Sequence, residues 1–188
     1  MAHIARSQAD VLDEMLVLRC QQGDGHAVEL LVGRWQPRLL RQALRLTGDL
    51  EAASDAVQEA WLAIVRGLGR LHDPARFRPW AYQIVSRKCT DWVRRRQRRR
   101  RLDRRVAAEN GAEAAAPVAD DRLAQVRRQL RLLPSDRRAI LSMHYVEGMS
   151  VREIAEVLSI PEGTVKSRLF HARNRLRDSL EESTDDST

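Results

Sequence analysis

The sequence is poor in the residues that stabilise or equip several common classes of protein. Only two cysteines, Cys20 and Cys89, occur in 188 residues, and they lie far apart in the chain. Such a pair provides neither the disulfide framework of a small secreted domain nor the ligand spacing of a zinc site. We therefore expect two buried thiols in a reducing compartment, with no disulfide and no bound metal.

Long apolar runs are also missing. No segment approaches the roughly 18 consecutive apolar residues that a membrane-spanning helix needs. The first residues of the chain do not form the apolar core of a signal segment. The sequence therefore predicts a cytoplasmic protein that makes no membrane contact.

The residues typical of an enzyme site are not found together. The five histidines are scattered, and the segment 23–25 is interpreted as a turn rather than as a glycine-rich phosphate loop. Asp55 and Glu59 are four residues apart on one predicted helix and could in principle share a metal, but a solvated or partner-facing acidic patch is the simpler interpretation. A recombinase would need a nucleophile among arginines, and Ser7 lies in an irregular terminus. We predict no enzymatic activity and no cofactor.

The hydrophobic residues favour helix over sheet. Aromatic residues make up only 4% of the chain, and the other apolar residues are mostly Leu, Ala and Val. Helical periodicity runs from Val11 to about Arg96 and resumes near Asp120. Between these stretches an arginine run gives way to an alanine-rich segment that contains glycine, which is typical of a flexible tether. The predicted fold is all-α, with two small helical domains (10–97 and 120–182) joined by a flexible linker (98–119).

Several helix boundaries can be placed from local signals. Gly48 is expected to end the second helix, and the third helix extends from about Leu50 to Gly67. The fourth helix begins near Arg78 and continues through Arg96 or beyond, and the acidic tail after Leu180 is expected to fray. The inner face of the third helix is predicted to consist of Ala53, Ala56, Val57, Ala60 and Ile64.

The excess of positive charge is concentrated in one segment. The chain carries 33 basic and 26 acidic residues, a formal net charge of +7. Between Arg87 and Arg105 there are 11 basic residues and two acids, and the rest of the chain is close to neutral. A positive field concentrated in this way attracts polyanions, of which we expect nucleic acid.

The segment from Ser150 to Leu180 has the pattern of two helices joined by a tight turn. Ser150 and Glu153 form a capping box at the start of the first helix. Ala155 is small where a second helix must cross closely, and Pro161 suits the first turn of that second helix. The sequence therefore predicts a helix-turn-helix.

The second helix of this pair has two distinct faces. Val165 and Leu169 face inward, and almost no acid occurs between Thr164 and Arg177 on the other face. Such a helix can lie in the major groove of DNA, although a solvated charged face would have a similar composition. The outward-facing residues are Lys166, Ser167, Phe170, His171 and Arg173.

Aromatic rings are interleaved with basic residues in the fourth helix, at Trp80, Tyr82 and Trp92. Each ring has two interpretations. It can stack on a base while the arginines hold phosphates, or it can be a core anchor with a polar tip.

These segments, in this order, resemble the extracytoplasmic-function (ECF) sigma factors of bacterial RNA polymerase. The resemblance covers about Val11 to Leu180 without the linker. GDLEAASDAVQEAW (48–61) is similar to the helix that binds the polymerase clamp, and FRPWAYQIVSRKCTDWVRRR (77–96) to the element that recognises and melts the −10 region. The domain that reads the −35 region resembles LPSDRRAILSMHYVEGMSVREIAEVLSIPEGTVKSRLFHARNRLR (133–177).

The resemblance implies three groups of contact residues. Polymerase binding is implied for Asp55, Gln58, Glu59 and Trp61. Contact with the −10 element is implied for Trp80, Tyr82, Arg87, Lys88, Asp91, Arg94 and Arg95. Contact with the −35 element is implied for Thr164, Lys166, Ser167, Arg168, Phe170, His171 and Arg173, of which Arg168 and Arg173 are candidates for phosphate.

One departure from the family concerns the turn of the helix-turn-helix. Ser159 stands where these proteins usually have glycine. If the turn requires a positive φ angle, a residue with a Cβ atom costs about 1 kcal/mol there.

The resemblance also implies partners. These are core RNA polymerase (its clamp and flap regions), promoter DNA as duplex and as melted strand, and an anti-sigma factor. The alternative is a free-standing helix-turn-helix regulator that binds a palindromic duplex as a dimer. The segment Gly48–Arg96 favours the sigma factor, because a simple repressor does not need it.

Overall fold

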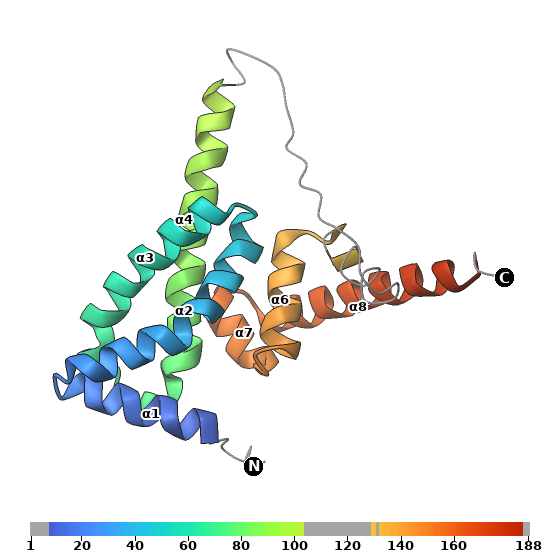
Figure 1. The fold of residues 1–188 in the computed structure, drawn as a ribbon. Helices are drawn as coiled ribbons and strands as arrows, with labels where there is room; N and C mark the ends of the chain where they lie inside the picture. Colours follow the sequence, from blue (N-terminus) through green and yellow to red (C-terminus); the bar gives the residue numbers. More distant parts are fainter. Residues whose placement is uncertain (1–7, 104–128, 131, 186–188) are drawn as a thin grey trace. The chain divides into compact units, whose positions relative to one another are not determined.

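The computed structural model describes residues 8–103, 129–130 and 132–185. The regular secondary structure in these ranges is entirely helical, which confirms the predicted all-α fold (Figure 1). The chain divides into two compact units, one containing the first helices as far as Trp92 and the other containing most of the chain after Trp92. The boundary after Trp92 falls within one helix, which begins at Phe77 and ends at Asp103.

The amino-terminal unit is built from α1 (Gln8–Gln21), α2 (Gly25–Thr47), α3 (Leu50–Gly67) and α4 (Phe77–Asp103). Two short 3₁₀ turns, η1 (Leu68–Arg70) and η2 (Pro74–Arg76), lie between α3 and α4. The α2 helix packs against both α1 and α3.

Aspartates and a glycine set the boundaries of these helices. Asp24 accepts hydrogen bonds from the backbone N–H groups of His26 and Ala27 at the start of α2. Gly48 ends α2 with a φ angle of 70°, as predicted, and Asp49 caps α3 through the N–H of Ala52.

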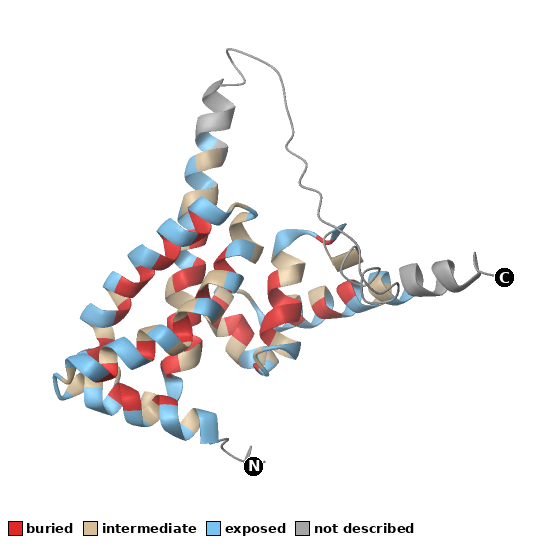
Figure 2. Cartoon of the chain, viewed as in Figure 1, coloured by how far each residue is buried: buried red, intermediate tan, exposed pale blue. Residues whose placement is uncertain are grey.

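Trp35 lies at the centre of the amino-terminal core. It is fully buried and makes edge-to-face contacts with Phe77 and Tyr82, with ring centroids 5.3 and 6.1 Å away. Figure 2 shows buried residues, in red, on each of the helices of this unit. Its indole N–H donates to Oδ1 of Asp13 at 3.1 Å, and the same oxygen accepts from Arg34. Because Asp13 is itself buried, this pairing satisfies a carboxylate that would otherwise be costly to remove from water.

The α3 helix has one buried and one exposed face. The predicted inner stripe, Ala53 to Ile64, is buried throughout, which confirms it. Small alanine side chains on this face let α2 approach closely. The exposed residues of the opposite face include Asp55, Gln58, Glu59, Leu62 and Val65.

The carboxy-terminal unit contains α6 (Ser135–Tyr145), α7 (Val151–Leu158) and α8 (Glu162–Asp185). The predicted capping box is present. The backbone N–H of Ser150 donates to Oε2 of Glu153 at 2.8 Å, and the N–H of Glu153 donates to Oγ of Ser150 at 3.2 Å.

The inward face of α8 consists of Val165, Leu169 and Ala172, which are buried at helical spacing. Ala155 of α7 is buried as well. The turn before α8 holds Ser159 at a φ angle of 54°, so the turn does require a positive φ angle. These features are those of the predicted helix-turn-helix.

Two helices continue into segments that were predicted to be linker or frayed tail. The α4 helix continues to Asp103, six residues into the segment predicted as linker. Its last residues are mostly arginine, which has a high helix propensity, and neither glycine nor proline interrupts them. The α8 helix reaches Asp185, five residues into the tail that was expected to fray. The remainder of the predicted linker, 104–119, and the predicted helix start near Asp120 lie outside the described residues.

Candidate functional site

The exposed face of α8 presents a mixed basic and aromatic surface. Lys166, Ser167 and His171 are exposed, Thr164 is half-buried, and Phe170 is 54% exposed. The rings of Phe170 and His171 lie edge to face with centroids 5.7 Å apart. A large exposed ring beside hydrogen-bonding groups can read a base edge, including the methyl group of thymine.

Two arginines of α8 have partners within the same unit. Nη1 of Arg168 lies 3.1 Å from a carboxylate oxygen of Asp136 on α6, and Nη1 of Arg173 lies 3.5 Å from the hydroxyl of Tyr145. The ion pair orients Arg168 and neutralises part of its charge. Of the two, Arg173 is therefore the stronger phosphate candidate.

The α4 helix also has a basic face. Arg87, Asp91, Arg94 and Arg95 are exposed. Positions 87, 91, 94 and 95 recur every three or four residues, so they share one side of the helix. This face can follow a phosphate backbone.

The aromatic residues of α4 differ in exposure. Tyr82 has no exposed surface and packs against Trp35, so in this structure it is a core residue and is not placed for the predicted contact with the −10 element. Trp80 is half-buried. For Tyr82, the core interpretation of the sequence is the one that the burial favours.

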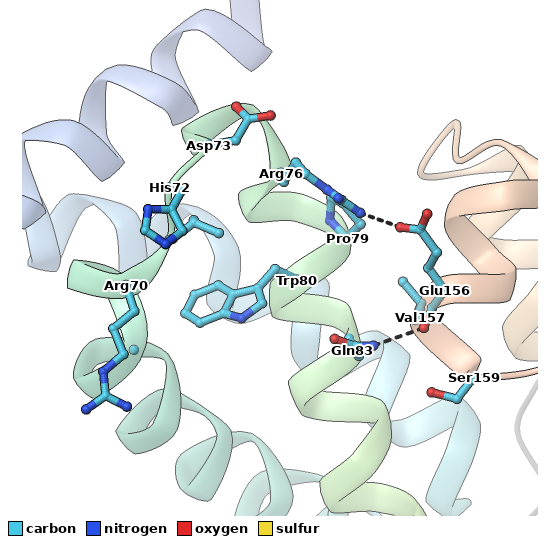
Figure 3. Close-up of a pocket in the computed structure, with 12 residues that line it drawn as sticks. Arg70, His72, Asp73, Arg76, Pro79, Trp80, Gln83, Glu156, Val157 and Ser159 are labelled. Atoms are coloured by element: carbon cyan, nitrogen blue, oxygen red, sulfur yellow. Dashed lines mark hydrogen bonds and ion pairs between the residues drawn. The ribbon is translucent and has the colours of Figure 1, made fainter.

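The Trp80 indole packs against the end of α3. A Cβ atom on Gly67 would lie 2.8 Å from Cζ2 of the indole, so a larger residue at this position would displace the ring. Figure 3 shows the ring extending toward the segment that carries Arg70 and His72. This segment is tied to α1, because the side-chain amide of Gln21 donates to the carbonyl oxygens of Leu68 and Leu71.

The predicted polymerase-binding residues are not all on the surface. Asp55, Gln58 and Glu59 are exposed along one face of α3. Trp61 is only 9% exposed, and its indole N–H donates to the side-chain oxygen of Gln36. Trp61 therefore supports α3 from within, and the exposed apolar residues next to the acidic group are Leu62 and Val65.

One contact joins two residues that were predicted to bind different partners. Nζ of Lys88 lies 3.0 Å from Oε2 of Glu59, so a −10 candidate is paired with a polymerase-binding candidate. The two residues are 29 positions apart, and no local pattern predicts their contact.

The two thiols, Cys20 and Cys89, differ in how far they are buried. Cys89 is fully buried, and burial raises the pKa of its thiol to about 12. Cys20 is half-buried, not buried as predicted, and partial burial together with the charge of Asp24 raises its pKa. Neither thiol forms a disulfide, and the described residues contain no group of His, Cys, Asp and Glu side chains suited to a metal.

Among the residues that the structure describes, every helix is too short or too polar to cross a bilayer.

Comparison with known families gives two matches. The model described as "Sigma-70 region 2" matches residues 31–99, which include α3 and most of α4. The model described as "Sigma-70, region 4" matches residues 123–176, which include the helix-turn-helix.

Curated proteins align with nearly the whole chain. The RNA polymerase sigma-H factor of Pseudomonas aeruginosa is 32% identical over 182 residues, covering 90% of this chain and 94% of its own length. The ECF RNA polymerase sigma-E factor of Escherichia coli is 33% identical over 179 residues, covering 87% and 92%.

Two solved structures have a similar helical fold. CnrH, in complex with the cytosolic domain of CnrY, aligns with a TM-score of 0.62 and 27% identity, covering 91% of this chain and 98% of that one. The sigma factor RpoE of Bartonella quintana, in complex with the anti-sigma factor NepR, aligns with a TM-score of 0.65 and 24% identity, covering 81% and 96%.

Proposed function

Because the chain belongs to the ECF family of RNA polymerase sigma factors, which direct transcription, we propose that it binds core polymerase, reads the −35 element and opens the −10 element. The single observation that best supports DNA reading is the exposed outer face of α8, where Lys166, Phe170 and His171 stand clear of the buried Val165 and Leu169. A helix held by its inner face is rigid enough to place these side chains in a major groove.

The α4 helix is proposed to hold the melted strand. Opening duplex DNA costs about 1.4 kcal/mol of stacking per step. The exposed Arg87, Arg94 and Arg95 can bind phosphates, and the half-buried ring of Trp80 can support an unstacked base. Tyr82 is left out of this group because it is buried.

The exposed face of α3 is proposed to bind polymerase. Asp55, Gln58 and Glu59 offer acceptors to a basic surface, and Leu62 and Val65 offer apolar area beside them. Charged groups of this kind favour orientation and association rate, whereas buried apolar area contributes more of the affinity.

An anti-sigma factor is proposed as a further partner. This proposal is supported by the solved relatives, since RpoE of Bartonella quintana was crystallised with the anti-sigma factor NepR and CnrH with the cytosolic domain of CnrY. Co-purification of the chain with a protein that blocks its binding to core polymerase would test it.

Reconstitution with core polymerase tests the main proposal. Promoter fragments are first selected from a random DNA library with the reconstituted complex, and run-off transcription is then measured on them. We expect specific transcripts only when both the chain and core polymerase are present. Equal transcription without the chain would contradict the proposal.

A substitution on α8 tests the −35 assignment. Phe170→Ala should lower run-off from a selected promoter about fivefold or more, because the loss of the specific contacts to one base pair costs about 1–3 kcal/mol. Binding to core polymerase, measured by gel filtration, should not change. Tight, specific binding of the chain alone to a palindromic duplex would instead favour a free-standing regulator.

A further inference from the structure

The contact between Glu59 and Lys88 joins the two binding faces of the amino-terminal unit. Nζ of Lys88 lies 3.0 Å from Oε2 of Glu59, and the two side chains are 50% (Glu59) and 35% (Lys88) exposed. Glu59 lies with Asp55 and Gln58 on the proposed polymerase face of α3. Lys88 follows Arg87 on the proposed DNA face of α4.

Each residue of this pair can bind a different macromolecule. A basic group of polymerase would attract the Glu59 carboxylate, and a DNA phosphate would attract the Lys88 ammonium. In the free chain the carboxylate opposes DNA binding, because it neutralises the ammonium group that would bind the phosphate. A cation supplied by polymerase would remove this effect.

We infer that Glu59 restrains Lys88 in the free protein and releases it to a promoter phosphate when core polymerase engages Glu59. The inference rests on the proposed function, because it needs both binding events. Coupling of this kind is reciprocal. A phosphate that takes Lys88 therefore also frees Glu59 for polymerase, and each partner strengthens the binding of the other.

The expected size of the effect is modest. Exposed ion pairs contribute little, so releasing Lys88 should change DNA affinity by about two- to fivefold. One additional phosphate contact should also make the affinity for single strands more sensitive to salt, by about 0.7 in the slope of log K against log salt.

A double-mutant cycle on the free, full-length chain measures this coupling. The probe is a fluorescein-labelled single-stranded oligonucleotide carrying the −10 sequence of a selected promoter, and affinity is read by anisotropy over a series of salt concentrations. Glu59→Gln should tighten binding about two- to fivefold and steepen the salt dependence. In a Lys88→Gln background the same change should have no effect.

A matched control separates the ion pair from net charge. Glu51→Gln removes one exposed negative charge from the same helix, eight residues or about 12 Å before Glu59, which is beyond the Debye length of about 8 Å at physiological salt. It should leave DNA affinity unchanged. An equal gain in Glu51→Gln, or a gain from Glu59→Gln that persists without Lys88, would overturn the inference.

The same DNA affinity is then measured for the complex with core polymerase. With core polymerase bound, Glu59→Gln should no longer increase DNA affinity, because Lys88 is already released. A gain that stays the same with and without polymerase would also overturn the inference.

Failure of the proposed function is distinguishable from failure of the inference. If Lys88→Gln transcribes as well as the unaltered chain and Glu59→Gln binds core polymerase as tightly, the proposed contacts themselves are wrong. If both variants lose those activities but the free chain shows no coupling, only the exchange of Lys88 is wrong.

Discussion

Ser159 occupies a backbone conformation that disfavours any residue with a Cβ atom. Its φ angle is 54°, and its N–H donates to the carbonyl oxygen of Glu156 in the turn that ends α7. A left-handed conformation costs a non-glycine residue about 1–2 kcal/mol, and the greater freedom of glycine in the unfolded chain offsets part of any gain.

We predict that Ser159→Gly raises the free energy of unfolding by about 0.5–1 kcal/mol. Urea denaturation followed by circular dichroism measures the change. Ser159→Ala is the matched control, since it removes the hydroxyl but keeps the Cβ atom, and it should give no gain. A gain of the same size from alanine would mean that the hydroxyl, and not the backbone, is the source of the strain.

Because of Cys89, we expect the free energy of unfolding of the amino-terminal unit to vary with pH in the alkaline range. Its pKa is about 12 in the folded chain, whereas an exposed thiol titrates near 9.0. Between these values the unfolded chain loses a proton that the folded chain keeps. The free energy of unfolding therefore falls as pH rises above about 9, by up to about 1.4 kcal/mol per pH unit from this one group.

The prediction concerns the difference in the free energy of unfolding between the unaltered chain and Cys89→Ala. The alanine variant should be less stable at pH 8, because the substitution leaves a cavity. This difference in free energy should become smaller between about pH 9 and 10.5. Urea titrations under reducing conditions measure both free energies. A gap that stays constant with pH would show that the buried thiol does not control this dependence. Cys20→Ala should show a smaller narrowing, because Cys20 is only half-buried.

At the scale of single elements, the local sequence accounts for most of the helices and for several of their boundaries. Periodic apolar residues predict α3 and both helices of the helix-turn-helix. Gly48 marks the end of α2, and Ser150 with Glu153 marks the start of α7. Each of these signals lies within a few residues of the feature that it predicts, so no knowledge of the tertiary fold is needed.

Other features depend on which helices meet, and these could not be predicted. Tyr82 and Trp61 were predicted to contact DNA and polymerase, but packing against α2 buries both of them. The pairing of Glu59 with Lys88 requires α3 and α4 to be adjacent. The linker was predicted to start at 98, within α4, because a run of arginines has no apolar periodicity although it has a high helix propensity.

The capping box at the start of α7 gives a prediction about one element. Ser150 and Glu153 exchange two hydrogen bonds, at 2.8 and 3.2 Å, before a helix of only eight residues. Ser150→Ala should lower the free energy of unfolding by about 1 kcal/mol. Glu153→Ala should cost less on its own and much less in the Ser150→Ala background, because the two residues act together. Additive losses in the double variant, measured by urea denaturation, would contradict a cooperative box.

At the scale of the whole molecule, each unit has its own buried core. Trp35, Phe77 and Tyr82 pack together in the amino-terminal unit, and Ile140, Ile154 and Leu169 are buried in the carboxy-terminal one. A sigma factor that contacts a promoter at two separated elements benefits from two binding domains that fold independently. The sequence predicted such a division from its composition, and the structure divides into two compact units.

Independent cores predict independent folding. A fragment of residues 1–103 should fold alone, because the buried aromatic cluster and the Asp13 pairing with Trp35 lie entirely within it. Its Tm should lie within about 4–8 °C of the matching transition in the full chain, which corresponds to about 1 kcal/mol for a domain of this size. Near-ultraviolet circular dichroism reports the packing of Trp35, and calorimetry reports the number of transitions. Ser150→Ala serves as the internal control, since in the full chain it should lower only the transition that is missing from the fragment. A fragment that lacks the tryptophan signal, or a full chain in which Ser150→Ala shifts every transition together, would mean that the two units fold as one and that the chain does not contact its promoter through separable domains.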